Sequence, residues 1–363
     1  MVAAPSGSHL GSHLRVVFFG TPGFAVPALE ALIGSGHDVV AVVSQPDRPR
    51  GRGHRVLPTP TRQVAETHGI PVIQPLKIKE EAFLQRIREL APDLGVVVAF
   101  GRILPDALIA IPRLGMINVH ASILPRYRGA APIQRAVLAG DAETGVTIMR
   151  VATELDAGPT FAATAVPIPS DATSGDMEST LAHLGATLLL PVVDDLAAGR
   201  AVETPQDDAR ATHAAKITKA DGAIDWTESA AVIHNKVRGL QPWPLASAHL
   251  AGERLVFRRT VPLTLGVRSA SGSSPGVRSA RDGSGVNGSR VEAKTDLTPG
   301  LDANADLTPP GTVVRAQGDD LIVACGGDTA LRVVEIQPEG RRTMTAREFV
   351  SGRGVVAGAR FEP

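Results

Sequence analysis

Two kinds of apolar pattern alternate along the first part of the chain. Continuous apolar runs, typical of strands buried on both faces of a sheet, predict strands at 14–19, 39–43, 94–100, 116–120 and 146–151. Apolar residues at helical spacing predict helices at 25–33, 79–90, 104–109, 130–138 and 174–196. Strands separated by helices in this way predict a doubly wound, mostly parallel α/β sheet, in a first domain that we expect to span 14–199.

The second part of the chain has a different pattern. A polar segment at 200–222 is predicted to be an interdomain linker. After it, a helix at 230–240 and several short strands with turn signals predict a small β-barrel domain over 223–363. The strand candidates are 255–261, 312–316, 321–325 and 331–336.

Two segments are excluded from the predicted fold. Residues 267–309 are rich in Gly, Ser, Pro and Asp, and they hold too few apolar residues to build a core. We therefore expect a disordered insertion between two strands of the barrel. Residues 1–13 contain G-S-H-L twice in tandem and lack the charged start and apolar core of a signal peptide, so we expect a disordered extension or a tag.

Composition narrows the class of protein. With 37 basic and 37 acidic residues, the chain carries no overall charge that would attract nucleic acid, so such contacts require a local cluster. The single cysteine, Cys325, excludes internal disulfides and cysteine-based zinc sites and is compatible with a reducing cytoplasm. No continuous apolar run approaches the roughly 20 residues that span a bilayer. We expect a cytoplasmic monomer with no membrane partner and no metal.

A glycine-bearing turn, G-T-P-G at 20–23, joins the first predicted strand to the first helix. Such a turn indicates an anion site, because a helix N-terminus presents free N–H groups. However, the spacing G-x-G-x-x-G is absent, and no acidic residue closes the second strand. These absences disfavour a nicotinamide-dependent dehydrogenase.

The most informative stretch is G-M-I-N-V-H-A-S-I-L-P-R-Y-R-G-A-A, at 115–131. Alternation along its strand puts Asn118 and His120 on one side, where an amide could bind a developing oxyanion and an imidazole could move a proton. The alternative is a turn cap beside a half-buried histidine. Asp156 follows a later strand and precedes a Gly-Pro turn, so it is either a loop carboxylate of the same site or an aspartate that stabilises the turn.

The densest positive cluster lies in a predicted loop at 45–60. It contains Arg48, Arg50, Arg52 and Arg55 among prolines and glycines. These arginines repel one another unless an anion is present, which favours contact with phosphate or RNA. The alternative is a solvated surface loop.

These motifs together resemble the 10-formyltetrahydrofolate-dependent formyltransferases, most closely the members that act on a methionine-charged tRNA. The long motif N-V-H-A-S-I-L-P-R-Y-R-G-A-A-P-I-Q-R-A carries the resemblance, together with E-L-D-A-G-P at 154–159. It extends to F-F-G-T-P-G-F-A at 18–25, Q-P-D-R-P-R-G-R-G at 45–53 and Q-P-W-P at 241–244.

The resemblance implies a Rossmann-like formyltransferase domain, followed by an OB-like domain that contacts tRNA. It implies 10-formyltetrahydrofolate as the formyl donor and charged initiator tRNA, through the α-amino group of its methionine, as the acceptor. The family's catalytic residues correspond to Asn118, His120 and Asp156. Its folate-binding turn corresponds to Ser122, Ile123, Leu124 and Pro125, with Ile123 in place of a leucine.

The chemistry expected of these residues is acyl transfer. Asn118 would donate to the oxyanion of the tetrahedral intermediate, and His120 would stabilise that oxygen or carry a proton toward N10 of the folate. Asp156 would orient His120 and help to remove the amine proton; the sequence leaves the division of proton transfer open. Two alternatives remain: a folate-dependent transferase or hydrolase acting on a small amine, and a non-catalytic RNA-binding protein.

Overall fold

A computed structural model describes residues 13–50, 55–264 and 308–363. The chain divides into two compact units, Met1–Ile217 and Thr218–Pro363. Three predicted features lie outside the described residues: residues 1–12 of the extension, Arg52, and residues 267–307 of the insertion.

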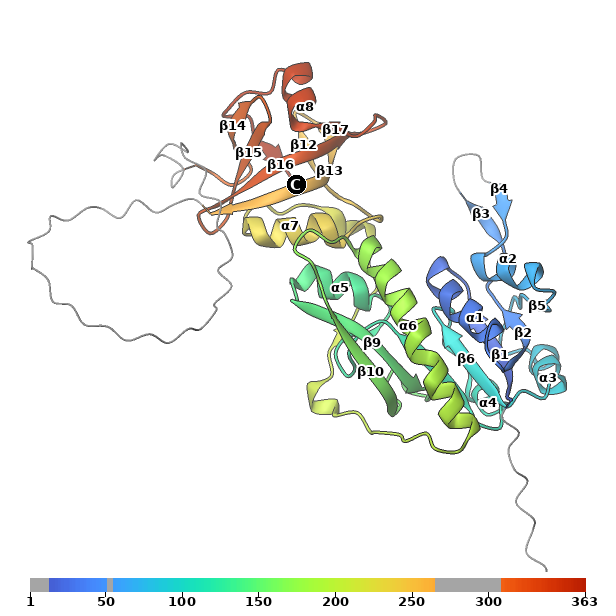
Figure 1. Cartoon of the computed structure of the whole chain (residues 1–363). Helices are drawn as coiled ribbons and strands as arrows, with labels where there is room; N and C mark the ends of the chain where they lie inside the picture. The colour runs from blue at the N-terminus through green and yellow to red at the C-terminus, as the bar shows by residue number, and fades with distance from the viewer. Residues whose placement is uncertain (1–12, 51–54, 265–307) are drawn as a thin grey trace, which may run out of the picture. The chain divides into compact units, whose positions relative to one another are not determined.

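The first unit is built on a seven-stranded sheet in the order β10-β9-β7-β6-β1-β2-β5 (Figure 1). The strands from β7 to β5 are parallel to one another, whereas β9 pairs antiparallel with β7 and β10. This confirms the predicted mostly parallel sheet. The strands are β1 (Arg15–Gly20), β2 (Asp38–Val43), β5 (Val72–Ile73), β6 (Leu94–Val98), β7 (Met116–His120), β9 (Glu143–Arg150) and β10 (Thr160–Pro167).

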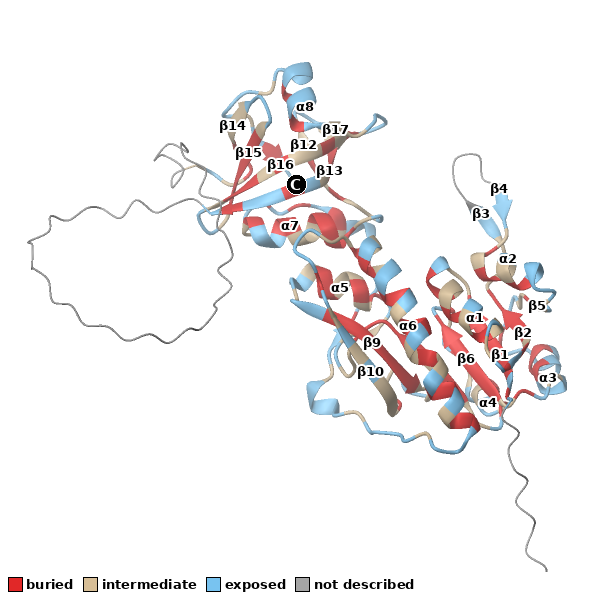
Figure 2. Ribbon diagram, in the orientation of Figure 1, coloured by how far each residue is buried: buried red, intermediate tan, exposed pale blue. Residues whose placement is uncertain are grey.

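Alternate residues of β1 contribute to two separate cores. Val16 and Phe18 pack in one core with residues of α1 and α6, and Val17 and Phe19 pack in the other with residues of α3 and α4. Each buried side chain of this size stabilises the fold by about 1.5–3 kcal/mol. Burial on both faces explains the continuous apolar runs of the sequence (Figure 2). The helices are α1 (Val26–Ile33), α2 (Pro60–Thr67), α3 (Glu81–Glu89), α4 (Asp106–Ile109), α5 (Pro132–Ala139) and α6 (Ser174–Ala197).

Helix α6 covers one face of this sheet. Its first turn is closed by a capping box, in which the Asp176 N–H donates to Thr173 Oγ1 (3.2 Å) and the Thr173 N–H donates to Asp176 Oδ2 (2.9 Å). By length and composition α6 could cross a membrane, but half of its most apolar window is buried inside the protein. A core helix of a soluble domain has the same composition, so this match is weak support for a membrane span.

The segment 45–60, predicted to be a loop, contains a short hairpin. Strands β3 (Arg48–Arg50) and β4 (Arg55–Leu57) pair antiparallel, with Pro49 opposite Val56. The prediction missed these two strands, whereas 45–47 and 58–59 lie outside any helix or strand. Three-residue strands are too short to show an alternating pattern of apolar and polar residues. Backbone pairing between β3 and β4, and not burial of their side chains, forms the hairpin.

The predicted linker 200–222 differs from the structure in its first part. Thr204 exchanges two backbone hydrogen bonds of 2.8 Å with Thr160, and β11 (His213–Ala214) pairs with β8 (Arg128–Gly129). The chain up to Ile217 therefore belongs to the first unit. This segment is polar because it lies at the surface, where it is held by backbone hydrogen bonds. Hydropathy alone does not distinguish such a segment from a free linker.

The second unit is a curled antiparallel half-barrel, consistent with the predicted OB-like domain. Its strands follow the order β14-β15-β16-β13-β12-β18, and β17 pairs with β16. A bridge between Thr312 and Arg360 joins the two ends of this order. Trp226, Phe257 and Phe361 pack in its core with ring centroids 5.4–5.6 Å apart. The elements are α7 (Ala230–Gly239), β12 (Ala246–Leu250), β13 (Glu253–Thr264), β14 (Val313–Gln317), β15 (Asp320–Cys325), β16 (Thr329–Pro338), β17 (Met344–Thr345), α8 (Ala346–Arg353) and β18 (Phe361–Glu362).

The buried position of Cys325 predicts an unreactive thiol. Cys325 is 7% exposed, and burial raises the pKa of its thiol to about 12. At pH 8 only about one thiol in 10⁴ would be the reactive thiolate. We expect iodoacetamide to leave the folded protein unmodified for hours and to modify it within minutes in denaturant, as measured by mass spectrometry. Rapid modification of the folded protein would contradict this environment.

Candidate active site

Strand β7 presents the two predicted catalytic residues at its carboxyl end. Asn118 lies opposite Met149 and His120 lies opposite Thr147 of β9, so both residues keep a fixed register in the sheet. Two positions apart on one strand, their side chains leave the same face. Asn118 is half-buried, and its side-chain amide has no hydrogen-bond partner among the described residues. The amide is therefore available to donate to a bound ligand.

His120 is 5% exposed and has a partner on each side of its ring. Its Nε2 donates to the backbone carbonyl of Tyr127 (2.9 Å), and its Nδ1 lies 3.6 Å from Asp156 Oδ2. A carbonyl oxygen only accepts, so this bond fixes the hydrogen of the neutral imidazole on Nε2. Nδ1 is then free to take a proton beside the carboxylate, which would stabilise the resulting imidazolium.

Asp156 lies in the loop that joins β9 to β10, and this loop brings its side chain to His120. Because β9 runs antiparallel to β7, the last residue of β9, Arg150, lies opposite Ile117 and not beside His120. The loop is closed at its neck by a hydrogen bond from the Arg150 N–H to the Pro159 carbonyl (2.8 Å). Glycine is required at 158, because a Cβ there would lie 2.0 Å from the Arg150 carbonyl oxygen.

The Asp156 carboxylate is held by the backbone as well. Its Oδ2 accepts a hydrogen bond from the Gly129 N–H (2.9 Å), and the side chain is 14% exposed. The residue itself has a φ of 51°, in the left-handed region that aspartate tolerates better than most residues. The structure thus brings Asp156 to His120. Sequence reasoning missed the carbonyl of Tyr127 and the N–H of Gly129, because backbone groups leave no signal in residue identity.

The turn at 122–125 is ordered by its own polar groups. Ser122 is buried, and its hydroxyl donates to the Arg126 carbonyl (2.6 Å). Thr147 Oγ1 donates to the Ser122 carbonyl (2.7 Å) and accepts from the Leu124 N–H (3.1 Å). The Ser122 hydroxyl therefore shapes the turn, while Ile123, Leu124 and Pro125 remain half-buried. Folate binding by these four residues stays a prediction.

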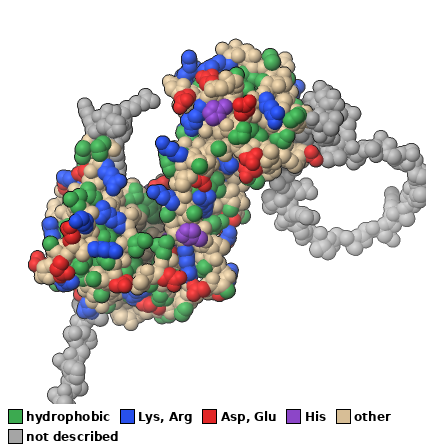
Figure 3. Space-filling view, turned by 180° about the vertical axis from the view of Figure 1, so that it is seen from behind, with side chains coloured by type: hydrophobic (Ala, Val, Ile, Leu, Met, Phe, Trp, Pro, Cys, Tyr) green, Lys and Arg blue, Asp and Glu red, His purple; other side chains and the backbone are tan. Residues whose placement is uncertain are grey.

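Three of the four predicted tRNA-binding arginines lie on the hairpin: β3 holds Arg48 and Arg50, and β4 holds Arg55. Arg52 lies outside the described residues. Arg48 is exposed. On the face of the first unit that Figure 3 shows, positive and negative side chains are intermixed. The concentration of arginine in this segment is a feature of the sequence, and contact with tRNA stays a prediction.

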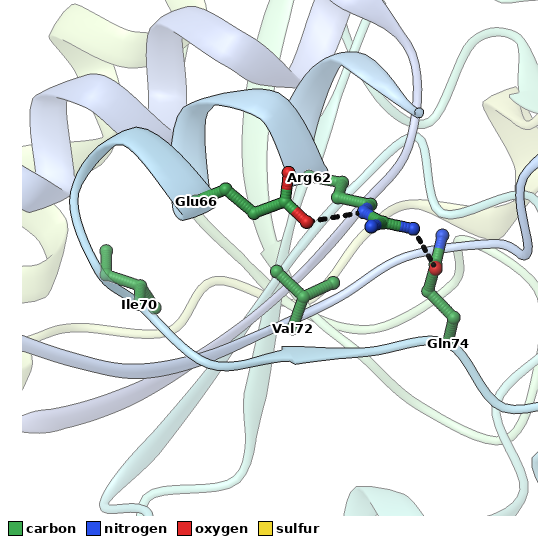
Figure 4. A pocket seen from close by; sticks show the side chains of 5 residues that line it. All are labelled: Arg62, Glu66, Ile70, Val72 and Gln74. Atoms are coloured by element: carbon green, nitrogen blue, oxygen red, sulfur yellow. Dashed lines mark hydrogen bonds and ion pairs between the residues drawn. The ribbon is translucent and has the colours of Figure 1, made fainter. Parts of the chain in front are cut away.

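A polar cluster stands at the base of this hairpin. Asp47, which precedes β3, accepts hydrogen bonds from Arg62 Nη1 (2.5 Å) and Gln74 Nε2 (2.8 Å). Arg62 also pairs with Glu66 (2.7 Å) beside a cavity of about 340 Å³ lined by Ile70 and Val72 (Figure 4). None of the predicted catalytic residues lines this cavity. The cluster anchors the hairpin and contains none of the predicted catalytic residues.

The arrangement at β7 combines an unpaired amide with an imidazole–carboxylate pair. Such a set can stabilise an oxyanion and transfer protons, which are the two requirements of acyl transfer to an amine. The chain's own side chains supply both requirements. Among the described residues, no group of three or more His, Cys, Asp or Glu side chains could hold a metal ion.

Comparisons with known proteins agree with this assignment of chemistry. The formyl transferase family model matches residues 14–193, and the model of the formyl transferase C-terminal domain matches residues 216–354. The methionyl-tRNA formyltransferase of Methylococcus capsulatus is 42% identical over 348 residues, covering 96% of this chain and 99% of the relative. That of Moorella thermoacetica is also 42% identical, over 95% of this chain and 98% of the relative.

Solved structures share the fold at low sequence identity. An N-formyltransferase from Helicobacter canadensis, in complex with folinic acid and dTDP-3-aminofucose, superposes with a TM-score of 0.59 at 15% identity, covering 90% of this chain and 99% of that one. HypX from Aquifex aeolicus, in complex with tetrahydrofolic acid, has a TM-score of 0.55 at 15% identity, covering 95% of this chain and 48% of that one.

Proposed function

Because the chain belongs to the formyltransferase family and matches methionyl-tRNA formyltransferases over nearly its whole length, we propose that it formylates charged initiator tRNA. The enzyme transfers a formyl group from 10-formyltetrahydrofolate to the free α-amino group of the methionine, giving formylmethionyl-tRNA. The observation that carries the proposal is the unpaired amide of Asn118 beside the His120–Asp156 pair. Neither a turn cap nor a satisfied core histidine requires that arrangement.

The reaction is assigned to residues in the order of its steps. The neutral amine attacks the formyl carbon, and the carbonyl electrons move to oxygen, where Asn118 donates a hydrogen bond. The new N–C bond leaves a positive nitrogen, whose proton passes to the His120–Asp156 pair. The C–N10 bond then breaks, and N10 of tetrahydrofolate receives a proton from the same pair.

The folate is proposed to bind at the turn formed by Ser122, Ile123, Leu124 and Pro125. The half-buried side chains of the last three offer an apolar surface, and the buried hydroxyl of Ser122 fixes the shape of that surface. A flat aromatic ligand such as the pterin of a folate suits an apolar surface with backbone polar groups at its edge.

The tRNA is proposed to contact the arginine hairpin and the second unit. Arg48, Arg50, Arg52 and Arg55 would pair with backbone phosphates, which supply most of the affinity of such complexes. We further propose that the enzyme acts as a monomer in the cytoplasm, without a membrane partner. The single buried cysteine supports a reducing compartment.

One assay tests the proposed function. The purified protein is incubated with 10-formyltetrahydrofolate and charged initiator tRNA, and the aminoacyl end is analysed for formylmethionine. A parallel reaction replaces the tRNA by a nucleotide-linked amino sugar, and another omits the acceptor and measures release of formate. Formylation of the tRNA alone supports the proposal. Formylation of the sugar, or release of formate without an acceptor, would favour the small-amine transferase or the hydrolase.

A further inference from the structure

We propose that Gln206, together with Arg128, is a positioning residue that holds Asp156 against His120. This inference rests on the proposed function, because it assigns Gln206 a part in the same reaction. Gln206 lies in the segment whose composition predicted a linker, far along the chain from the other residues of the site. It does not touch the reacting groups and acts through the loop that carries Asp156.

The side chain of Gln206 uses its full hydrogen-bonding capacity. Its Nε2 donates to the backbone carbonyls of Asp156 (2.9 Å) and Gly158 (2.7 Å). Its Oε1 accepts from Nε (3.0 Å) and Nη2 (2.8 Å) of Arg128. An amide offers two donors and two acceptor sites, so no hydrogen-bonding position remains for another ligand. Saturation of this kind points to a structural clamp and not to a substrate contact.

The hydrogen bonds of Gln206 complete a closed network of contacts around His120 and Asp156. Arg128 follows Tyr127, whose carbonyl binds His120, and precedes Gly129, whose N–H binds the Asp156 carboxylate. Gln206 connects the Arg128 side chain to the backbone of Asp156 itself. The segment 127–129 is therefore linked to the Asp156 loop twice, by the Gly129 N–H and by the Arg128 side chain through Gln206. His120 belongs to the same network through the Tyr127 carbonyl.

The loop requires such a clamp. Asp156 has a left-handed φ of 51°, a conformation that costs a residue other than glycine some free energy, although less for aspartate than for most. The neck at Arg150 and Pro159 fixes the ends of the loop but not its tip. Without the two bonds from Gln206, the carbonyls of Asp156 and Gly158 would be free to turn toward water, and the Gly129 N–H alone would hold the carboxylate. The 3.6 Å separation from His120 Nδ1 would then increase.

Two substitutions separate this role from general support of the fold. Gln206→Met keeps the length of the side chain and removes all four hydrogen bonds. Gln206→Glu keeps a partner for Arg128 but removes both donors to the loop. We expect each to lower kcat by roughly 10²-fold, the loss typical of a misplacement of about 1 Å, with KM for both substrates within about twofold. If Gln206 served only to hold Arg128, the glutamate variant would retain wild-type kcat.

Asp208→Ala is the matched control. Asp208 also pairs with Arg128 Nη2 (2.6 Å), but its side chain is 79% exposed, and none of its hydrogen bonds with described residues reaches the Asp156 loop. Its replacement should leave kcat within about twofold of wild type, because an exposed ion pair contributes little. A loss as large as that of Gln206→Met would show that any disturbance of Arg128 is damaging, and would overturn the specific role of Gln206.

A measurement independent of catalysis completes the test. The Asp156 carboxylate lies 3.6 Å from His120 Nδ1, so moving it away changes the surroundings of that ring nitrogen. We expect the imidazole ¹⁵N NMR resonances of His120 to shift in Gln206→Met and to keep their wild-type positions in Asp208→Ala. In the wild-type assay, absence of formylmethionyl-tRNA would refute the proposed function, whereas these resonances would still decide the role of Gln206. Wild-type positions of the His120 resonances in Gln206→Met would overturn the inference.

Discussion

Replacing Asn118 by alanine is expected to lower kcat by about 10²–10³-fold, the effect of losing one oxyanion-hole donor. The Asn118 amide has no partner among the described residues, so its removal leaves no buried group unsatisfied and should leave the fold intact. The amide is proposed to act on charge that exists only in the transition state. KM for the formyl donor and binding of a folate analogue should therefore change by no more than about twofold.

His120→Ala and Asp156→Ala should each cause a loss of similar size, and their combination should cost little more than either alone. The two groups act as a pair, so removing one already disables the other. Single-turnover formylation of charged tRNA measures these losses. His183→Ala, which removes an exposed histidine of α6, is the matched control and should retain wild-type activity. A variant lacking all three catalytic side chains that formylates at a near wild-type rate would refute the assignment.

Replacing the four hairpin arginines, Arg48, Arg50, Arg52 and Arg55, by alanine is expected to raise KM for charged tRNA by about tenfold or more at moderate salt. Removing one arginine–phosphate ion pair should reduce the slope of log KM against log salt concentration by roughly 0.7–0.9. KM for 10-formyltetrahydrofolate should remain unchanged, because the proposed folate turn follows β7 and not β2. Steady-state kinetics at several salt concentrations provide the measurement.

A control with equal loss of charge distinguishes a local interaction from a general electrostatic effect. Four exposed arginines of the first unit outside the hairpin serve for this purpose: Arg86, Arg88, Arg200 and Arg210. Their replacement should leave the salt slope near that of the wild type. Equal slopes for the wild type and the hairpin variant would remove the hairpin from the tRNA interface.

The architecture of the first unit was predictable because burial on both faces leaves a direct trace in the sequence. The runs at 14–19 and 94–100 correspond to β1 and β6, and helix α6 begins at Ser174 as predicted. The edge strand β10 was missed, since its residues alternate only between half-buried and exposed. The hairpin strands were missed because each has three residues, too few for a pattern.

Only those parts of the site that depend on side-chain identity could be predicted from the sequence. Asn118 and His120 could be paired from the alternation of a strand, and Asp156 could be assigned to the site from the family resemblance. The return of the Asp156 loop along the sheet could not be predicted, because it follows from β9 running antiparallel to β7. Gln206 could not be found at all. Its role depends on two backbone carbonyls and on the pairing of β11 with β8, and neither appears in composition or spacing.

The hydrogen bond that closes the neck of the Asp156 loop affects which positions of this loop can change during evolution. Arg150 and Pro159 pair with each other across the neck, so the exposed residues 153–155 can be exchanged or extended without shifting the register of β9 and β10. The cost of closing a loop changes slowly with its length, by about 0.6 kcal/mol for each doubling. Selection could therefore change the exposed surface of this loop while Asp156, His120 and the sheet stay as they are. In a directed-evolution library, variation at 153–155 should be tolerated, whereas variation at Asp156 or Gly158 should not.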